Sequence, residues 1–168
     1  MRAKSANWFE VKIRYDKDLG DGNIKPVTEQ YVLDADSFSD AEECITEEMA
    51  THISGDYKIK DIKPAVYREI FFSDMGNDDC WFKAKLQFIT FDEKTSKEKR
   101  SNVNYLVQAH ALPQAVNYIG EVMGNTMIDY VIASISDTKI QDVFEKKATF
   151  GNAETTDAKP EYEEGVNQ

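Results

Sequence analysis

Hydrophobic and polar residues alternate along the chain in two separate stretches, each of which opens on a Trp-Phe pair. Residues 8–15 read WFEVKIRY and residues 81–88 read WFKAKLQF. In both, apolar side chains take every second position and mostly polar ones lie between, as in a strand with one buried face. A polar loop and a further strand follow in each case, the second strands being predicted near residues 27–35 and 102–109.

The period then changes from two residues to about four, which predicts a helix after each strand pair. Its apolar stripe consists of Ala41, Ile45, Met49 and Ile53 in the first stretch, and of Ala115, Ile119 and Met123 in the second. Ser39 to Glu42 have the composition of a capping box, and Pro113 suits the first position of the second helix. Third strands are predicted near residues 56–62 and 129–135, and short fourth, edge strands over residues 66–72 and 139–144.

The two stretches match in order at a spacing of about 73 residues, from Trp8 and Trp81 to Phe71 and Phe144. We interpret them as a tandem duplication of a β-β-α-β unit with a short fourth strand, spanning residues 7–72 and 80–145. The predicted fold class is α+β, with both units forming one pseudo-twofold domain whose helices pack on antiparallel sheet. A continuous sheet with both helices on one side is the simplest arrangement, and two independent lobes are the alternative. The short link, residues 73–79, favours tight packing.

Composition limits the classes of protein that the chain can represent. Hydrophobic residues make up 41% of the chain, so a packed core is expected, and the net charge of −11 opposes generic attraction to DNA or anionic membranes. Residues 149–168 carry five acids and one lysine, and we predict that they form a disordered acidic tail. The polar start without an apolar leader, and the lack of an apolar run of membrane-spanning length, predict a cytoplasmic protein that does not enter the membrane.

No catalytic, metal or cofactor site is predicted, and we expect a protein that is not an enzyme. Residues 16–23 resemble a calcium loop, but the sixth and twelfth positions hold Asp21 and Val27 instead of Gly and Glu, so a hairpin turn is favoured. Cys44 and His52 lie eight residues apart on one helix, about 12 Å, which is too far for a thiolate–imidazole pair. No glycine-rich phosphate loop is present in the sequence.

Charge is segregated by element, and the outward sheet face is predicted to be basic. By strand parity, this face also presents the two indole rings, and cations with aromatic rings on a sheet are typical of single-stranded nucleic acid binding. The candidate residues are Trp8, Lys12, Arg14, Lys58, Lys60, Trp81, Lys83 and Lys85, and the second hairpin adds Lys94, Lys97, Lys99 and Arg100. Alternating lysines also keep an exposed sheet soluble, and a Trp that opens a strand is often a packing residue.

Two further functions remain open at this point. The chain is a protein-interaction module if the acidic tail, an edge strand or the first helix recruits a partner. It is an acidic decoy if its negative net charge and its first helix mimic nucleic acid and so block a DNA-binding protein. The acids of that helix are Asp40, Glu42, Glu43, Glu47 and Glu48.

Residues 7–145 resemble a family of small uncharacterised proteins of Bacteroidetes bacteria, their phages and mobile elements. The segments SFSDAEE, which opens the first helix, and YVIASISDTKIQDVF, near the end of the second unit, carry the resemblance. The resemblance implies a cytoplasmic or phage-encoded accessory protein and carries no activity or functional residue with it. The association with phages favours a role in DNA metabolism.

Overall fold

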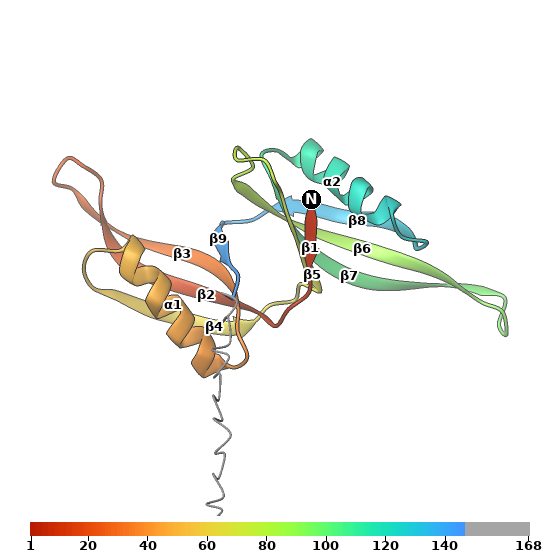
Figure 1. Cartoon of the computed structure of the whole chain (residues 1–168), viewed down its shortest axis with the longest axis horizontal. Helices are drawn as coiled ribbons and strands as arrows, with labels where there is room; N and C mark the ends of the chain where they lie inside the picture. Colours follow the sequence, from red (N-terminus) through yellow and green to blue (C-terminus); the bar gives the residue numbers. More distant parts are fainter. Residues whose placement is uncertain (147–168) are drawn as a thin grey trace, which may run out of the picture.

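The computed structural model describes residues 1–146 and shows an α+β fold with two helices and nine strands in two sheets (Figure 1). The predicted tail, residues 149–168, lies outside the described residues. After β1 (Arg2–Lys4), the first half contains β2 (Trp8–Asp18), β3 (Ile24–Asp34), α1 (Phe38–His52), β4 (Tyr57–Pro64) and β5 (Glu69–Phe72). The second half contains β6 (Cys80–Asp92), β7 (Lys97–Ala109), α2 (Leu112–Gly124), β8 (Asp129–Asp137) and β9 (Ile140–Phe144). Both halves therefore have the element order β-β-α-β-β, as predicted; the duplication itself stays a prediction from the sequence.

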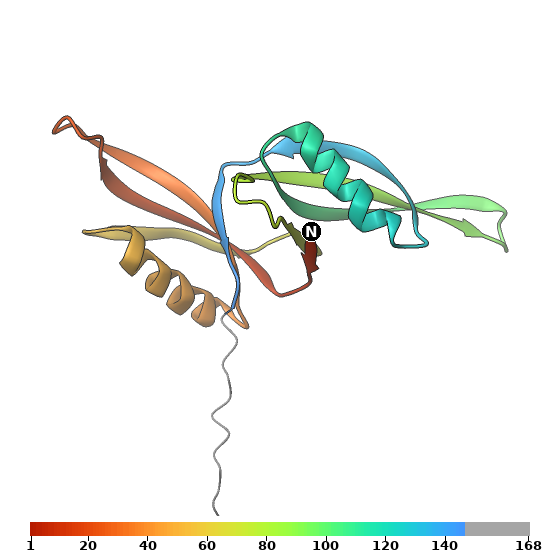
Figure 2. The ribbon, with the colours of Figure 1, turned by 45° about the horizontal axis from the view of Figure 1, so that its top comes forward.

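The two halves exchange their last strands. One sheet has the order β4-β2-β3-β9 and the other the order β1-β5-β7-β6-β8, so β5 joins the sheet of the second half and β9 joins that of the first. Both exchanged strands pair in parallel, β5 with β7 and β9 with β3. The sheets are therefore mixed, where antiparallel sheet was predicted. The predicted continuous sheet is wrong as well, because each half has its own sheet and its own helix (Figure 2).

A β-bulge lies at matching places on the two third strands. In the first half, Lys12 pairs with Asp61 and Ile13 with Ile59, which leaves Lys60 as the extra residue. In the second half, the extra residue is Ala133. Since a bulge bends and twists the strand that carries it, both sheets curve around their helices in the same way.

Both helices bury the stripes that the sequence predicts, except that Ile53, the last predicted residue of the first stripe, is the C-cap of α1 and is only half-buried. Ala41, Ile45 and Met49 are fully buried under α1, and α2 buries Ala115, Ile119 and Met123 in the same manner. The predicted capping box is shifted by two residues. Ser37, rather than Ser39, is the N-cap: its hydroxyl accepts a hydrogen bond from Asp40 N at 3.1 Å, and the Asp40 carboxylate accepts one from Asp36 N at 2.8 Å.

Each sheet packs its own helix, and a third apolar cluster joins the two sheets. The junction cluster consists of Trp8, Val32, Tyr67, Ile70, Phe72, Trp81, Leu106, Ile140 and Val143. Trp8 and Val32 lie on the helix-free face of the first sheet, and Trp81 and Leu106 lie on the helix-free face of the second. The exchanged strands β5 and β9 supply most of the other residues of the cluster. The two sheets therefore contact one another back to back near the starts of β2 and β6, as one body rather than two independent lobes.

The two predicted edge strands differ in the structure. β9 lies at the edge of its sheet, as expected, but β5 is flanked by β1 on one side and β7 on the other. Residues 66–72 therefore offer no free edge. Within residues 1–146, the long free edges belong to β4 and β8.

Candidate nucleic-acid interface

The structure separates the indole rings from the cations that were predicted to act with them. Trp8 and Trp81 do lie on the helix-free faces, as strand parity predicts, but both are only 3% exposed because the opposing sheet covers them. Neither ring is available to stack on a base in this conformation. That part of the predicted site is wrong, since parity identifies a face and says nothing of what packs against it.

The cations of the first half gather around a hollow beside β4. Arg14, Lys58 and Lys60 line it, together with Tyr15, Asp16, Asp56 and Tyr57. Lys12 lies next along β2, opposite Asp61. The two carboxylates within the hollow and the one opposite Lys12 offset most of the basic charge, so this face offers an anion little net attraction.

The predicted cations of the second half lie on a long hairpin that projects beyond α2. We define the second hairpin arm as residues 83–104, from β6 and β7 (Figures 1 and 2). It contains six lysine and arginine residues and three acids, net +3, within a chain whose net charge is −11. The corresponding arm of the first half, residues 10–30, has four basic and five acidic residues, net −1. The arms are therefore similar in shape and opposite in charge.

One face of the second hairpin arm combines cations, amides and an aromatic ring. On β6, it carries Lys83, Lys85, Gln87, Ile89 and Phe91, because alternate residues of a strand point to the same side. On β7, it carries Asn104, Asn102, Arg100 and Glu98, each directly opposite a residue of β6. Phe91 is 67% exposed, and the sequence signal for it is that it lies out of phase with the apolar positions Phe82, Ala84, Leu86 and Phe88, on the face opposite the helix.

Hydrogen bonds order the middle of this face. Gln87 Nε2 donates to Asn102 Oδ1 at 3.2 Å, and the Arg100 guanidinium donates to Gln87 Oε1 at 3.4 Å. Arg100 also lies 3.5 Å from the Glu98 carboxylate, an exposed ion pair that water and salt weaken. Among residues 1–146, Lys83 and Lys85 form no ion pair, so their charges are free to meet an anion.

A polar cluster near the start of α2 superficially resembles a catalytic triad, but its connectivity differs. The Asp78 carboxylate is buried and accepts hydrogen bonds from Ser73 Oγ and from Tyr118 OH, the latter at 2.5 Å, while His110 Nδ1 lies 2.9 Å from it. Burial alone would raise the pKa of Asp78, but these hydrogen bonds outweigh burial and lower it. In a triad, the imidazole lies between the hydroxyl and the carboxylate. Here the carboxylate is central, so the cluster anchors the loop after β5 against α2.

Neither thiol is activated. Burial raises the pKa of Cys44, and the neighbouring charges of Asp40 and Glu47 raise it further. Burial and Asp79 likewise raise the pKa of Cys80. A nucleophilic cysteine needs the opposite, a positive surrounding that lowers the pKa of the thiol. In the part of the chain that the structure describes, no three His, Cys, Asp or Glu side chains form a group able to hold a metal ion.

Fold and site together define a small α+β protein of two strand-exchanged halves with a basic hairpin arm. The chain belongs to the family described as a domain of unknown function, DUF4494, whose model matches residues 7–146. No curated protein matches the chain, and no solved structure does either. Among the described residues, neither helix has the length and apolar character needed to span a membrane.

Proposed function

We propose that the protein is a non-enzymatic, single-stranded nucleic acid binding protein that uses the helix-free face of the second hairpin arm. The observation that supports the proposal most directly is the net charge of +3 on this arm in a chain of net −11. Contacts with phosphates are the main sequence-independent source of affinity for nucleic acids. A basic arm within an acidic molecule orients the polyanion toward one surface and repels it from the others.

Each side chain on the arm face has a role in this proposal. Lys83, Lys85 and Arg100 contact phosphates, and Phe91 provides the exposed ring on which a base stacks. The amides of Gln87 and Asn102 are already hydrogen-bonded to one another and line the path between them. The first-half residues Lys12, Arg14, Lys58 and Lys60 make a smaller contribution, because Asp16 and Asp56 line the hollow with the last three and Asp61 lies opposite Lys12. A cytoplasmic setting and a role in the DNA metabolism of phages or mobile elements belong to the same proposal.

The proposal is tested by fluorescence anisotropy with labelled single-stranded DNA and RNA at low salt. The double variant Lys83→Glu, Lys85→Glu is expected to bind about 30-fold or more weakly, since two phosphate contacts become repulsions. The matched control, Lys17→Glu with Lys25→Glu, makes the same charge change on the first hairpin arm and is expected to have a small effect. Phe91→Ala is expected to weaken binding by about 1–3 kcal/mol through the loss of stacking.

The outcomes separate the alternatives. Equal losses in the double variant and its control would show attraction by overall charge and would overturn the assignment to the second hairpin arm. No binding by the unmodified protein at low salt would end the nucleic-acid proposal. In that case, capture of a basic DNA-binding protein by α1 would support the decoy hypothesis instead.

A protein-interaction function is the second candidate, and the contrast between the two free strand edges favours it. The edge of β4 carries Lys58, Lys60 and Lys63, which discourage pairing with another strand, whereas β8 has no charged residue from Tyr130 to Ser136. Pairing of β8 between copies predicts association in sedimentation velocity at rising concentration. Ala133→Lys places a lysine in the bulge of β8 at the position that Lys60 holds in the bulge of β4. This substitution is expected to abolish the association. A protein that is monomeric at every concentration would contradict pairing between copies.

A further inference from the structure

The helix-free faces of the two sheets differ in what lies opposite their lysines. In the first half, Lys12 of β2 lies directly opposite Asp61 of β4. On the same face, Lys63 lies opposite Glu10, and its Nζ atom is 3.6 Å from Glu10 Oε2. Opposite charges at cross-strand positions stabilise a sheet. At this point the outward face of the first half therefore consists of two neutral pairs.

The matching positions of the second half hold two lysines and no carboxylate. Lys83 lies opposite Ser136, and Lys85 lies opposite Ser134. The lysines are two and four residues after Trp81, and the serines are one and three residues after the β-bulge, as in the two neutral pairs of the first half. The lysines are partly buried and the serines are exposed. Two cations therefore face two hydroxyls where the first half balances its charge.

The four side chains have no other partners in the part of the chain that the structure describes. Neither lysine forms an ion pair there, and neither serine hydroxyl forms a hydrogen bond. The two lysines lie two residues apart on one strand and so on the same face, where their charges repel one another. An anion between them would remove this repulsion.

We propose that Lys83, Lys85, Ser134 and Ser136 together bind the oxyanion of a phosphate group, and we call them the lysine–serine site. The inference deepens the proposed function and rests on it for the source of the phosphate, a nucleic acid backbone. The two lysines are about 7 Å apart along β6, a distance that their long, flexible side chains can close around one phosphate. The serines are about 5 Å away across the ladder, and their hydroxyls donate hydrogen bonds to the remaining oxygens.

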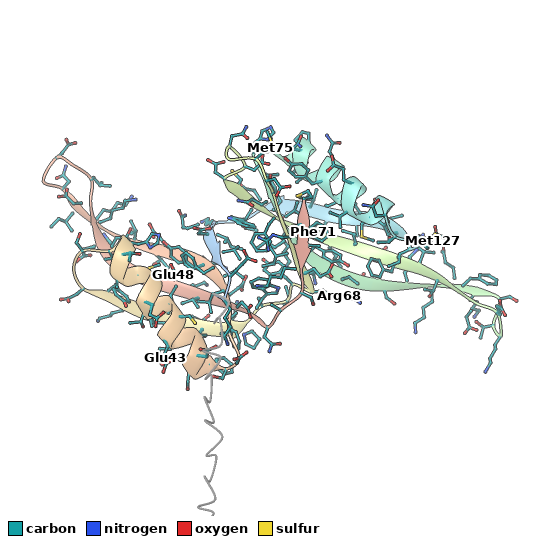
Figure 3. The ribbon with its side chains drawn as sticks, viewed as in Figure 1. Glu43, Glu48, Arg68, Phe71, Met75 and Met127 are labelled. Atoms are coloured by element: carbon teal, nitrogen blue, oxygen red, sulfur yellow. The ribbon has the colours of Figure 1, made fainter. Side chains whose placement is uncertain are left out.

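The rest of the face suits the same ligand. Asn104 of β7 lies on the other side of Lys85. The backbone N–H of Arg68 donates to the Asn104 carbonyl oxygen at 2.9 Å, so Arg68 enters the sheet beside Asn104 as a third cation (Figure 3 labels Arg68). Arg68 is exposed and forms no ion pair within residues 1–146. The acids that share this face, Glu98 and Asp129, lie further along the arm, beyond the pair that follows Lys85.

The test uses inorganic pyrophosphate as the probe and the full chain at low ionic strength. Backbone amide signals are followed by NMR during the titration. The signals of residues 83–85 and 134–136 are expected to shift until they saturate, and those of residues 10–12 and 61–63 are expected to stay in place. Such a pattern would locate the bound phosphate on the second sheet, at the lysine–serine site.

Variants of the serines separate hydrogen bonding from general charge. Ser134→Ala with Ser136→Ala is expected to weaken pyrophosphate binding about tenfold or more, since hydrogen bonds to a charged group are lost. Ser134→Asp gives Lys85 the kind of partner that Lys12 has, and is expected to weaken binding at least as much. The matched control is Ser101→Asp, which makes the same change opposite Phe88, on the other face of the sheet, and is expected to have little effect.

Two results with pyrophosphate would overturn the inference: signal shifts spread evenly over the lysines of both halves, or equal affinities of the unmodified protein and the double serine variant. Labelled single-stranded DNA, measured on the same variants, separates the inference from the proposed function. DNA binding that is lost with the lysines but unchanged without the serines would keep the proposed function and overturn the lysine–serine site. Serine-dependent pyrophosphate binding without any DNA binding would support a site for a small phosphate compound and end the proposed function.

Discussion

A substitution of Phe71 tests how strand exchange affects stability, because Phe71 belongs to the first half of the chain but lies in the core of the second half. It lies on β5 and is fully buried, and its ring stacks on Tyr105 with a centroid distance of 4.9 Å (Figure 3). Its core cluster also includes Leu86 and Ile119, both from the second half. Phe71→Ala removes this packing and leaves a cavity, at a cost of about 3–5 kcal/mol.

This cost is a large part of the stability of a typical domain, about 5–15 kcal/mol. With a urea dependence of about 2 kcal/mol per molar, the unfolding midpoint is expected to fall by roughly 2 M. Since β5 and β9 tie each sheet to the other half of the chain, both halves are expected to unfold together. The substitution should therefore lower the unfolding midpoint of the first half as much as that of the second half.

The assay compares urea unfolding by circular dichroism with pulsed labelling of Cys44, which reports on the first half alone. Both curves are expected to move by the same amount in Phe71→Ala. Phe91→Ala removes the same side chain from an exposed site, 67% exposed, and is expected to change stability by less than about 0.5 kcal/mol. The reasoning would be refuted if the Cys44 labelling midpoint were unchanged while the circular dichroism curve separated into two transitions. That result would show that the halves unfold independently.

Three further substitutions test local parts of the fold. Trp8 Nε1 is buried without a hydrogen-bond partner among the described residues, so Trp8→Phe is expected to cost about 1 kcal/mol or less in urea unfolding, far less than Trp8→Ala. The ionised Asp78 carboxylate stabilises the fold fully at pH values above the ordinary pKa of a carboxyl, and this stabilisation is lost as the pH falls through the lowered pKa of the folded state. Asp78→Asn is therefore expected to flatten the acid limb of the curve of stability against pH. Ser37→Ala removes the N-cap of α1 and is expected to cost about 1 kcal/mol, while Ser39→Ala costs little; equal costs in thermal unfolding would contradict the observed cap.

The local elements could be predicted from the sequence because their signals are local. The stripe of Ala41, Ile45 and Met49 specifies a helix and its buried face, and alternation in residues 8–15 specifies a strand, whatever packs around them. The structure confirms both. The cap was misplaced because two serines each have an acid three residues later, Ser37 with Asp40 and Ser39 with Glu42, and only the Ser37–Asp40 hydrogen bond distinguishes them.

Strand exchange could not be predicted from local patterns. The fourth strand of each half is only four or five residues long, EIFF in β5 and IQDVF in β9, and nothing in its residue pattern distinguishes the sheet of its own half from the sheet of the other. The exchanged strands supply residues to the junction cluster, which brings together side chains that lie far apart in the sequence. The burial of Trp8 and Trp81 follows from the same junction, and this is why the predicted site lost its indoles while its lysines stayed exposed or partly exposed.

The salt dependence of binding tests the proposed role of the second hairpin arm most directly. For single strands, each phosphate contact contributes about 0.7 to the slope of log K against log salt. We predict that Lys83→Ala with Lys85→Ala lowers the magnitude of this slope by about 1.4, and that Lys17→Ala with Lys25→Ala leaves it unchanged. Binding whose slope is the same in all three proteins, or no binding by the unmodified protein at low salt, would contradict the account.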